Sequence, residues 1–256
     1  MSETDSSQEL DPQLTPAREV PVCDALELLT HGELSIEGRL MTASNATLYC
    51  AATLNGVSAA CVYKPVAGER PLWDFPDGTL AEREVAAYEV SAATGWTIVP
   101  PTVHRDGPAG PGMVQLWIDE DESVDLVELI GSHSHEQLRR IAVFDAVINN
   151  TDRKGSHLLP TPSGHVYGID HGVSFHEDDK LRTVLWQWSG QRLTPEAVEA
   201  LTQLREGMAG ALGSRLEELL TRREVRAARH RLERLLLTGL HPMPSGDWPP
   251  VPYPPI

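Results

Sequence analysis

The segment IAVFDAVINNTDRKGSHLLPTPSGHVYGIDHGVSF, residues 141–175, decides the fold because polar breaks interrupt its apolar elements in a fixed order. It begins as an apolar helix, which breaks at Asn149-Asn150-Thr151. Two short apolar strands follow at 158–159 and 166–169, joined by a turn that contains prolines and a glycine. The pattern predicts a helix followed by a tight β-hairpin.

Two aspartates lie at the ends of these apolar elements. Asp152 follows the helix and Asp170 follows the second strand, so the hairpin separates them. A phosphoryl-transfer site needs one carboxylate near the attacking hydroxyl and another that binds the metal bridging the phosphates. The segment therefore has what such a site requires, and the rest of the chain can be searched for the other parts.

The whole chain has the composition of a globular protein, with 256 residues of which 41% are hydrophobic and 23% charged. That length suffices for one two-lobed domain or two small ones. No run of 18 apolar residues occurs, so we expect no integral membrane association. A net charge of −16 argues against nucleic acid as a partner. It also weighs against a lipid substrate, unless a local basic patch overturns it.

The N-terminal residues and the cysteines indicate a cytoplasmic protein. Residues 1–18 are polar and acidic, unlike a secretory signal, and we expect a disordered lead-in. The cysteines Cys23, Cys50 and Cys61 have no metal-binding spacing and cannot all pair. This usage suits a reducing cytoplasm.

Asn55-Gly56 is a strong hairpin signal in the N-terminal half. With these two residues as the loop, the register places Cys50 opposite Cys61 and Lys64 opposite Thr47. Neighbouring patterns predict a helix at 22–31, strands at 33–43, 47–54, 57–64, 96–102 and 112–118, and a helix at 80–93. Together they predict a sheet of about five strands with helices beside it.

The predicted register brings Lys64 beside a turn of small polar residues, 44–47. Backbone N–H groups of such a turn can approach phosphates, and a nearby ammonium neutralises them. The alternative is a surface lysine at a strand end. On the helix at 80–93, Arg83 is predicted on the polar side, and Glu84 could point back at Lys64 or belong to the solvated face.

The C-terminal half is predicted to be mostly helical, after an acidic connector at 119–125 where we place the lobe boundary. Its predicted elements are a helical turn at 126–130, a core helix at 136–149, and two helices within 195–239 that are broken near 210–213. The second of these helices is basic, which is typical of a solvated face. The two tryptophans within 183–188 either line a substrate groove or cap the core.

Two further features have two interpretations each. His133 and His135 could suggest a metal site, although a helix lead-in explains them better. The tail at 241–256 holds seven prolines and cannot form a regular helix or a central strand. It either packs as an extended segment over the helical lobe or binds a protein partner.

Five motifs in order carry a resemblance to a known family: VYKP at Lys64, REVAAYEV at Glu84, VQLWI at 114–118, TDRKGSH at 151–157 and GIDHGVSF at 168–175. Together they resemble the phosphatidylinositol 3- and 4-kinase superfamily, most of all its type II 4-kinase branch and compact bacterial relatives. The chain looks like a small actinobacterial group of such kinase-like proteins. The resemblance covers roughly residues 34–180.

The resemblance implies an α+β, bilobal protein-kinase-like fold. Its N-lobe would be an antiparallel sheet of about five strands plus one helix, and its C-lobe would be mostly helical. On this plan the N-lobe covers residues 19–120 and the C-lobe 121–240, with the lead-in at 1–18 and the proline-rich tail at 241–256.

The resemblance also implies roles for particular residues. Lys64 would bind the α- or β-phosphate of ATP, and Glu84 would orient Lys64. Asp152 would orient or deprotonate the acceptor hydroxyl, with Arg153 beside it. Asp170 would chelate Mg²⁺. The remaining nucleotide contacts would come from the phosphate-binding turn and from the backbone that holds adenine: Ser44, Asn45, Ala46, Thr47, Gln115, Leu116 and Trp117.

The sequence departs from the family pattern at two places. His157 stands where the family has a metal-binding asparagine, and a neutral imidazole ligates Mn²⁺ better than Mg²⁺. The turn at 44–47 lacks glycine. The expected function is ATP-dependent phosphorylation of a hydroxyl on a small molecule, a lipid head group or a protein, with Mg²⁺ or Mn²⁺. The alternative is a weak or inactive pseudokinase that senses nucleotide.

Overall fold

The computed structural model describes residues 22–40 and 45–256. The predicted lead-in at 1–18 and Ser44 lie outside the described residues. In chain order the elements are α1 (Val22–His31), β1 (Glu33–Arg39), β2 (Leu48–Leu54), β3 (Val57–Pro65), η2 (Val66–Gly68), α2 (Leu80–Thr94), β4 (Thr102–Gly107), β5 (Gly110–Leu116), α3 (Leu126–Gly131), α4 (Glu136–Ile148), η3 (Gly155–His157), β6 (Leu158–Pro160), β7 (Val166–Gly168), α5 (Pro195–Met208), α6 (Ala211–Leu219) and α7 (Arg222–Thr238).

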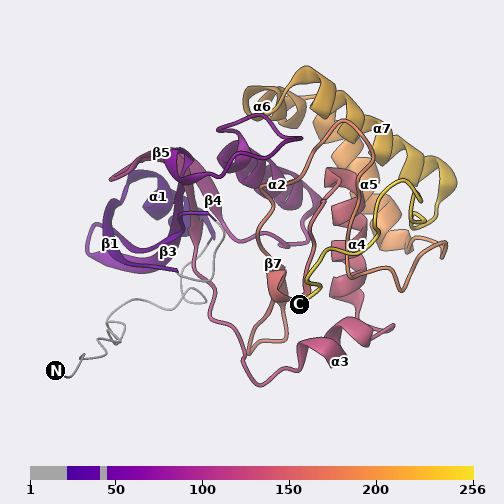
Figure 1. The fold of residues 1–256 in the computed structure, drawn as a ribbon, viewed down its shortest axis with the longest axis horizontal. Helices are drawn as coiled ribbons and strands as arrows, with labels where there is room; N and C mark the ends of the chain where they lie inside the picture. Colours follow the sequence, from indigo (N-terminus) through magenta and orange to yellow (C-terminus); the bar gives the residue numbers. More distant parts are fainter. Residues whose placement is uncertain (1–21, 41–44) are drawn as a thin grey trace.

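The N-terminal half is a five-stranded antiparallel sheet in the order β1-β2-β3-β5-β4, with α1 beside it (Figure 1). The predicted hairpin register is confirmed, since Cys50 lies opposite Cys61. Asn55 and Gly56 both have positive φ, 51° and 81°, as a two-residue turn with the twist of the strands requires. Leu29 of α1 packs with both cysteines in a buried apolar cluster.

The predicted strand at 96–102 is wrong, and β4 begins where that strand was expected to end. The apolar side chains of Ile98 and Val99 are buried in the large core formed with the helices. Their backbone N–H groups donate to Ser91 Oγ at 2.9 and 3.0 Å instead of to a neighbouring strand. An apolar run of this length fits a core-filling loop as well as a strand.

Helix α2 connects the sheet to the helical half. Its Ala86 and Val90 are fully buried and belong to the same core as α4, α5 and α7. Arg83, which was predicted on the polar side of this helix, is only 1% exposed. Its guanidinium donates to Ser174 O at 2.8 Å and pairs with Glu224 of α7 at 2.5 Å. This ion pair fixes α2 against the C-terminal helix.

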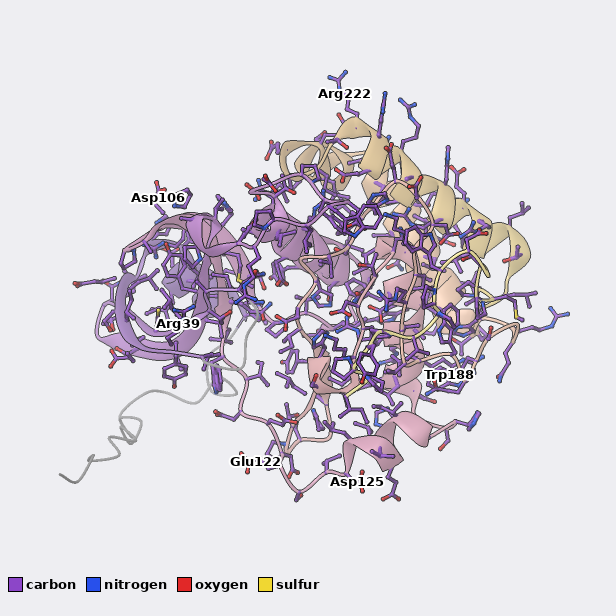
Figure 2. All side chains as sticks on the ribbon, viewed as in Figure 1. Arg39, Asp106, Glu122, Asp125, Trp188 and Arg222 are labelled. Atoms are coloured by element: carbon purple, nitrogen blue, oxygen red, sulfur yellow. The ribbon has the colours of Figure 1, made fainter. Side chains whose placement is uncertain are left out.

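The C-terminal region holds three helices, α5, α6 and α7, where two were predicted. The expected break near 210–213 ends α5, and a second break follows α6 because Thr221 and Glu224 form a capping box that begins α7. Arg222 points outward from α7 (Figure 2), in agreement with a solvated basic face. Arg231 differs, since it is buried and donates to Val147 O and His176 O.

The proline-rich tail packs on the chain itself, and its end lies against Gly155 of η3. Pro250 O accepts hydrogen bonds from Thr183 N at 3.0 Å and Trp186 Nε1 at 2.8 Å. Pro255 O accepts from Gly155 N at 2.7 Å. Of the two interpretations of the tail, these contacts favour packing on the chain itself. Of the two tryptophans within 183–188, which were expected to line a substrate groove or to cap the core, Trp188 is 1% exposed and belongs to the core.

Candidate active site

Lys64 lies at the centre of the site, near the end of β3. Its Nζ donates to Glu84 Oε1 of α2 at 2.9 Å and also to Asp170 Oδ1, which follows β7. Burial of the ammonium lowers its pKa, but the charges of Asp170 and Glu84 outweigh that effect and the pKa is raised. Lys64 is therefore a protonated cation held between two carboxylates from different elements.

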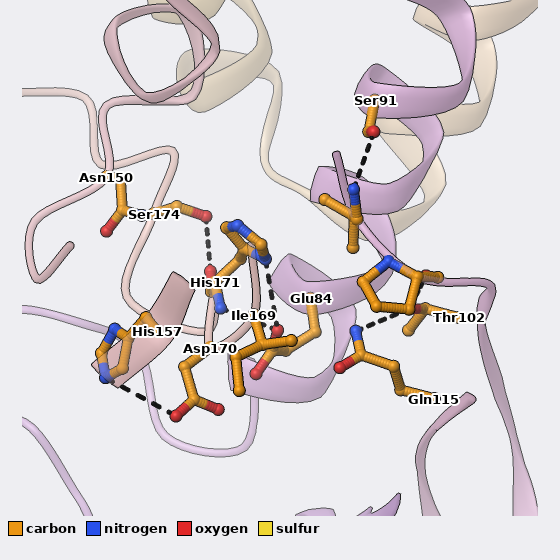
Figure 3. A network of polar contacts seen from close by, with 12 residues as sticks. Glu84, Ser91, Thr102, Gln115, Asn150, His157, Ile169, Asp170, His171 and Ser174 are labelled. Atoms are coloured by element: carbon orange, nitrogen blue, oxygen red, sulfur yellow. Dashed lines mark hydrogen bonds and ion pairs between the residues drawn. The ribbon is translucent and has the colours of Figure 1, made fainter. Parts of the chain in front are cut away.

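Asp170 ends the β6–β7 hairpin, in the left-handed region with φ of 59°. A non-glycine residue rarely adopts this conformation, which is common at functional sites. The carboxylate is 44% exposed, and its Oδ2 lies 3.7 Å from His157 Nε2 (Figure 3). Burial raises the pKa of Asp170, but Lys64 and then His157 outweigh it, so the pKa is lowered.

His157 and Asp170 can serve as donors to one divalent cation. Burial lowers the pKa of His157 to about 4, so its imidazole is neutral at pH 7 and can ligate. Its Nδ1 is buried without a hydrogen-bond partner, and its Nε2 faces Asp170. Across residues 22–40 and 45–256, no cluster of three or more His, Cys, Asp or Glu side chains could hold a metal by itself. The two donors fit a cation that also takes phosphate oxygens as ligands.

Asp152 lies in the turn after α4, close enough to Asp170 for the two charges to interact. Asn150 Oδ1 accepts from Asp152 N at 3.0 Å and fixes the turn. Burial raises the pKa of Asp152, and the ion pair with Lys154 at 3.1 Å opposes that shift. The carboxylate is 31% exposed, so an acceptor molecule can reach it.

Arg153, which was predicted in a catalytic role beside Asp152, has its side chain turned into the interior of the protein. The side chain is fully buried and forms a bidentate pair with Asp145, with Nε–Oδ2 at 3.0 Å and Nη2–Oδ1 at 2.9 Å. It also donates to Ile169 O at 2.9 Å. These contacts connect the turn that carries Asp152 to α4 and to the β6–β7 hairpin.

Residues 45–47, the described part of the predicted phosphate-binding turn, are hydrogen-bonded to the segment after β3. Ala46 N donates to Gly68 O at 3.1 Å, and Asn45 Oδ1 accepts from Arg70 N at 2.9 Å. A Cβ at residue 68 would overlap the Ala46 side chain, so the close approach requires glycine there. Thr47 immediately precedes β2, and the β2–β3 ladder ends at Leu48 opposite Tyr63, so Thr47 and Lys64 are the next residues beyond it.

Gln115, Leu116 and Trp117 lie at the end of β5, between β3 and β4. The backbone N–H of Leu116 donates to Pro101 O at 2.9 Å and that of Trp117 to Ala60 O at 3.0 Å. These two donors are therefore occupied within the chain. Gln115 is buried, and its side chain donates to Thr102 Oγ1 at 2.8 Å (Figure 3).

The structure also brings in two residues that the sequence analysis missed, Asp145 and His171. Both are fully buried, and both contact Arg153. Burial and then the charge of Arg153 lower the pKa of His171 well below its ordinary value. The available signal for Asp145 was a carboxylate inside the apolar run AVFDAVI, because a buried charge needs a partner.

Comparisons with known proteins show the family and the fold of the chain. The model of the family "Phosphatidylinositol 3- and 4-kinase" matches residues 106–238. Protein Rv2133c of Mycobacterium tuberculosis is 43% identical over 265 residues, which cover 90% of this chain and 95% of that protein. Two crystal structures of the Golgi casein kinase share the fold. The one with Mn/ADP bound has a TM-score of 0.58 at 15% identity over 86% of this chain and 75% of that one. The other has a TM-score of 0.56 at 14% identity over 85% and 75%.

Proposed function

The chain belongs to the phosphatidylinositol 3- and 4-kinase family, and from that premise we propose that it transfers the γ-phosphate of ATP to a hydroxyl group. The acceptor belongs to a small molecule, a lipid head group or a protein. The observation that carries the proposal is the position of Lys64, which contacts Glu84 from α2 and Asp170 from the β6–β7 hairpin. Such a cation between the two halves of the molecule is suited to hold phosphate oxygens.

In this proposal each residue has one task. Lys64 holds phosphate oxygens of the nucleotide, and Glu84 keeps the ammonium in place. Asp152 accepts the proton of the acceptor hydroxyl as the hydroxyl oxygen attacks the γ-phosphorus. The bond between the γ-phosphorus and the oxygen that bridges it to the β-phosphate breaks, and that oxygen leaves with ADP. Asp170 and His157 would hold a Mg²⁺ or Mn²⁺ ion, which when bound neutralises charge on the phosphates.

Positioning and charge neutralisation are enough for this reaction, and no covalent intermediate is needed. We place the nucleotide between an N-lobe at 19–120 and a C-lobe at 121–240. The turn at 45–47 would lie over the phosphates. At the end of β5 the adenine would use carbonyl oxygens, because the N–H groups of Leu116 and Trp117 are engaged.

A second candidate function is a nucleotide sensor with weak or no turnover. The observation that favours it is His157, since a neutral imidazole is a poor ligand for Mg²⁺. A sensor would keep Lys64 and Asp170 for binding while the transfer step is slow. Metal preference separates the two functions, because Mn²⁺-supported turnover favours the enzyme.

The test is release or transfer of the γ-phosphate of ATP by the purified protein, with Mg²⁺ and Mn²⁺ compared. Asp170→Asn is expected to abolish divalent-dependent turnover. Asp152→Asn is expected to lower turnover by about two to four orders of magnitude and to leave ATP binding intact. Unchanged turnover in both variants would exclude the proposed site, and metal-dependent binding without any turnover would favour the sensor.

We further propose that the protein acts in the cytoplasm. Cys50 and Cys61 lie opposite each other on β2 and β3, and both are free and buried. Burial raises the pKa of the Cys50 thiol to about 11, which keeps it protonated and unreactive. No helix among the described residues has the length and apolar character that crossing a membrane requires.

A further inference from the structure

His171 lies between the two halves of the site and has no assigned role. It is fully buried. Its backbone N–H donates to Glu84 Oε2 at 2.8 Å, and its ring Nδ1 lies 3.8 Å from the same oxygen (Figure 3). On the other side, its ring Nε2 lies 2.6 Å from Arg153 Nη2. His171 therefore contacts Glu84, the partner of Lys64, through its backbone N–H, and Arg153, the residue that follows Asp152, through its ring.

The contact with Arg153 fixes the tautomer of the ring. A guanidinium can only donate hydrogen bonds, so His171 Nε2 must accept and carries no proton. The ring proton is then on Nδ1, which faces Glu84 Oε2. The imidazole thus accepts a hydrogen bond from Arg153, while its Nδ1–H faces Glu84 at 3.8 Å without a hydrogen-bond partner. An apolar side chain of similar size would have neither the acceptor nor the N–H.

The contacts continue from Arg153 to the acceptor carboxylate. Arg153 pairs with Asp145 in α4, and Asp145 Oδ1 accepts from Asn150 Nδ2 at 3.1 Å. Asn150 Oδ1 in turn accepts from Asp152 N. A continuous set of polar contacts, most of them buried, therefore runs from Lys64 through Glu84 and His171 to the turn with Asp152.

We propose that His171 is a positioning residue that couples the Lys64–Glu84 pair to the turn carrying Asp152. The inference rests on the proposed function, in which these two parts act on the nucleotide and on the acceptor. Removing the ring acceptor would leave Arg153 with an unpaired donor and loosen the turn. Nucleotide contacts at Lys64 would remain.

The competing explanation is packing alone, because the imidazole also forms an edge contact with the Phe144 ring at 5.6 Å. Three variants separate the explanations. His171→Gln can place its carbonyl oxygen near the Nε2 position and accept from Arg153. His171→Asn keeps a polar group on the Glu84 side only. His171→Leu fills space and keeps neither contact.

The experiment measures kcat and KM for ATP in the full chain, with Mn²⁺, for wild type and the three variants. We expect His171→Leu to lower kcat by about 10- to 100-fold with little change in KM, the size usual for loss of a supporting contact. His171→Gln should recover most of this loss, and His171→Asn should not. The control is His230→Leu, at an exposed histidine of α7, which should behave as wild type.

A second readout keeps the test independent of turnover. Amide hydrogen exchange is followed at residues 150–155 in the same variants without nucleotide. His171→Leu is expected to speed exchange there by about tenfold, and His171→Gln to leave it near wild type, while β1 and β2 do not change. Equal effects of Leu and Gln, or no effect of Leu, would overturn the inference. An inactive wild type that shows this exchange pattern would contradict the proposed function and support the coupling.

Discussion

At the scale of single residues, His157 is the side chain that we expect to set metal preference. It is 12% exposed, and its Nε2 faces Asp170 Oδ2. Imidazole nitrogen favours Mn²⁺ over Mg²⁺, whereas an amide oxygen favours Mg²⁺. His157→Asn is therefore expected to raise the ratio of Mg²⁺- to Mn²⁺-supported turnover by about tenfold. Initial rates of phosphate release with each metal test this, and an unchanged ratio would remove His157 from the metal site.

His241 predicts a pH dependence of stability. Its side chain is buried, and burial and then Arg139 lower its pKa to about 4. The unfolded chain takes up a proton near the ordinary pKa of 6.5, while the folded chain does not. The contribution of His241 to the free energy of unfolding should therefore be fully present above pH 6.5. It should fall by about 1–3 kcal/mol as the pH is lowered towards 4. Urea unfolding from pH 7 to 4 measures the loss, which His241→Gln should reduce.

The residues of the site differ in how far the sequence could predict them. Lys64 near Thr47 follows from the hairpin register alone, and the expected contact with Glu84 is present at 2.9 Å. The burial of Arg153 could not be predicted, because its partner Asp145 lies on a separate element. Whether an arginine is buried depends on whether folding brings a carboxylate to it, and local patterns do not contain that information.

At the scale of elements, turn residues and apolar periodicity correctly predicted the elements that depend on neighbours in the sequence. The Asn55-Gly56 turn gave the pairing of β2 with β3, and the apolar stripe gave α4. The segment at 96–102 was misassigned because β-branched apolar residues suit a strand and a buried loop equally. Its true course depends on Ser91 of α2, which accepts its N–H groups.

Helix α2 forms two ion pairs with helices α6 and α7, one buried and one exposed, whose contributions to stability can be compared. The Arg83–Glu224 pair to α7 is buried, with side-chain exposures of 1% and 9%, whereas Glu89–Arg215 to α6 is 30% and 41% exposed. Breaking a buried pair leaves an uncompensated charge, so Arg83→Met should lower the free energy of unfolding by about 3–5 kcal/mol. Arg215→Met should cost less than about 1 kcal/mol. Similar losses in urea unfolding would contradict the assigned burial.

At the scale of the whole molecule, the C-terminal tail joins parts that are distant in sequence. The Lys180 ammonium lies 5.0 Å from the Trp73 ring centroid and 4.7 Å from that of Trp248, and its Nζ donates to Asp74. Further along, the tail reaches Gly155, close to Asp152. No periodic pattern predicts such a path, because a proline-rich segment has no regular pairing of its own.

We expect Trp248→Ala to release the tail and to lower the free energy of unfolding by about 1–2 kcal/mol, since it removes one cation–π contact and its buried area. The control is Tyr253→Ala, because Tyr253 is 90% exposed and its loss should change little. Urea unfolding of the two variants and limited proteolysis of the tail are the measurements. Equal stability of both variants would show that the tail is held elsewhere.

The stacking of Trp73 on Trp248 has an optical consequence. The two indole rings lie 6.2 Å apart at an angle of 26°. Aromatic chromophores at that separation couple their electronic transitions, and the coupled pair gives circular-dichroism bands of opposite sign that an isolated indole lacks. The chain thus contains its own spectroscopic reporter for the attachment of the tail, and that attachment can be followed in real time without a label.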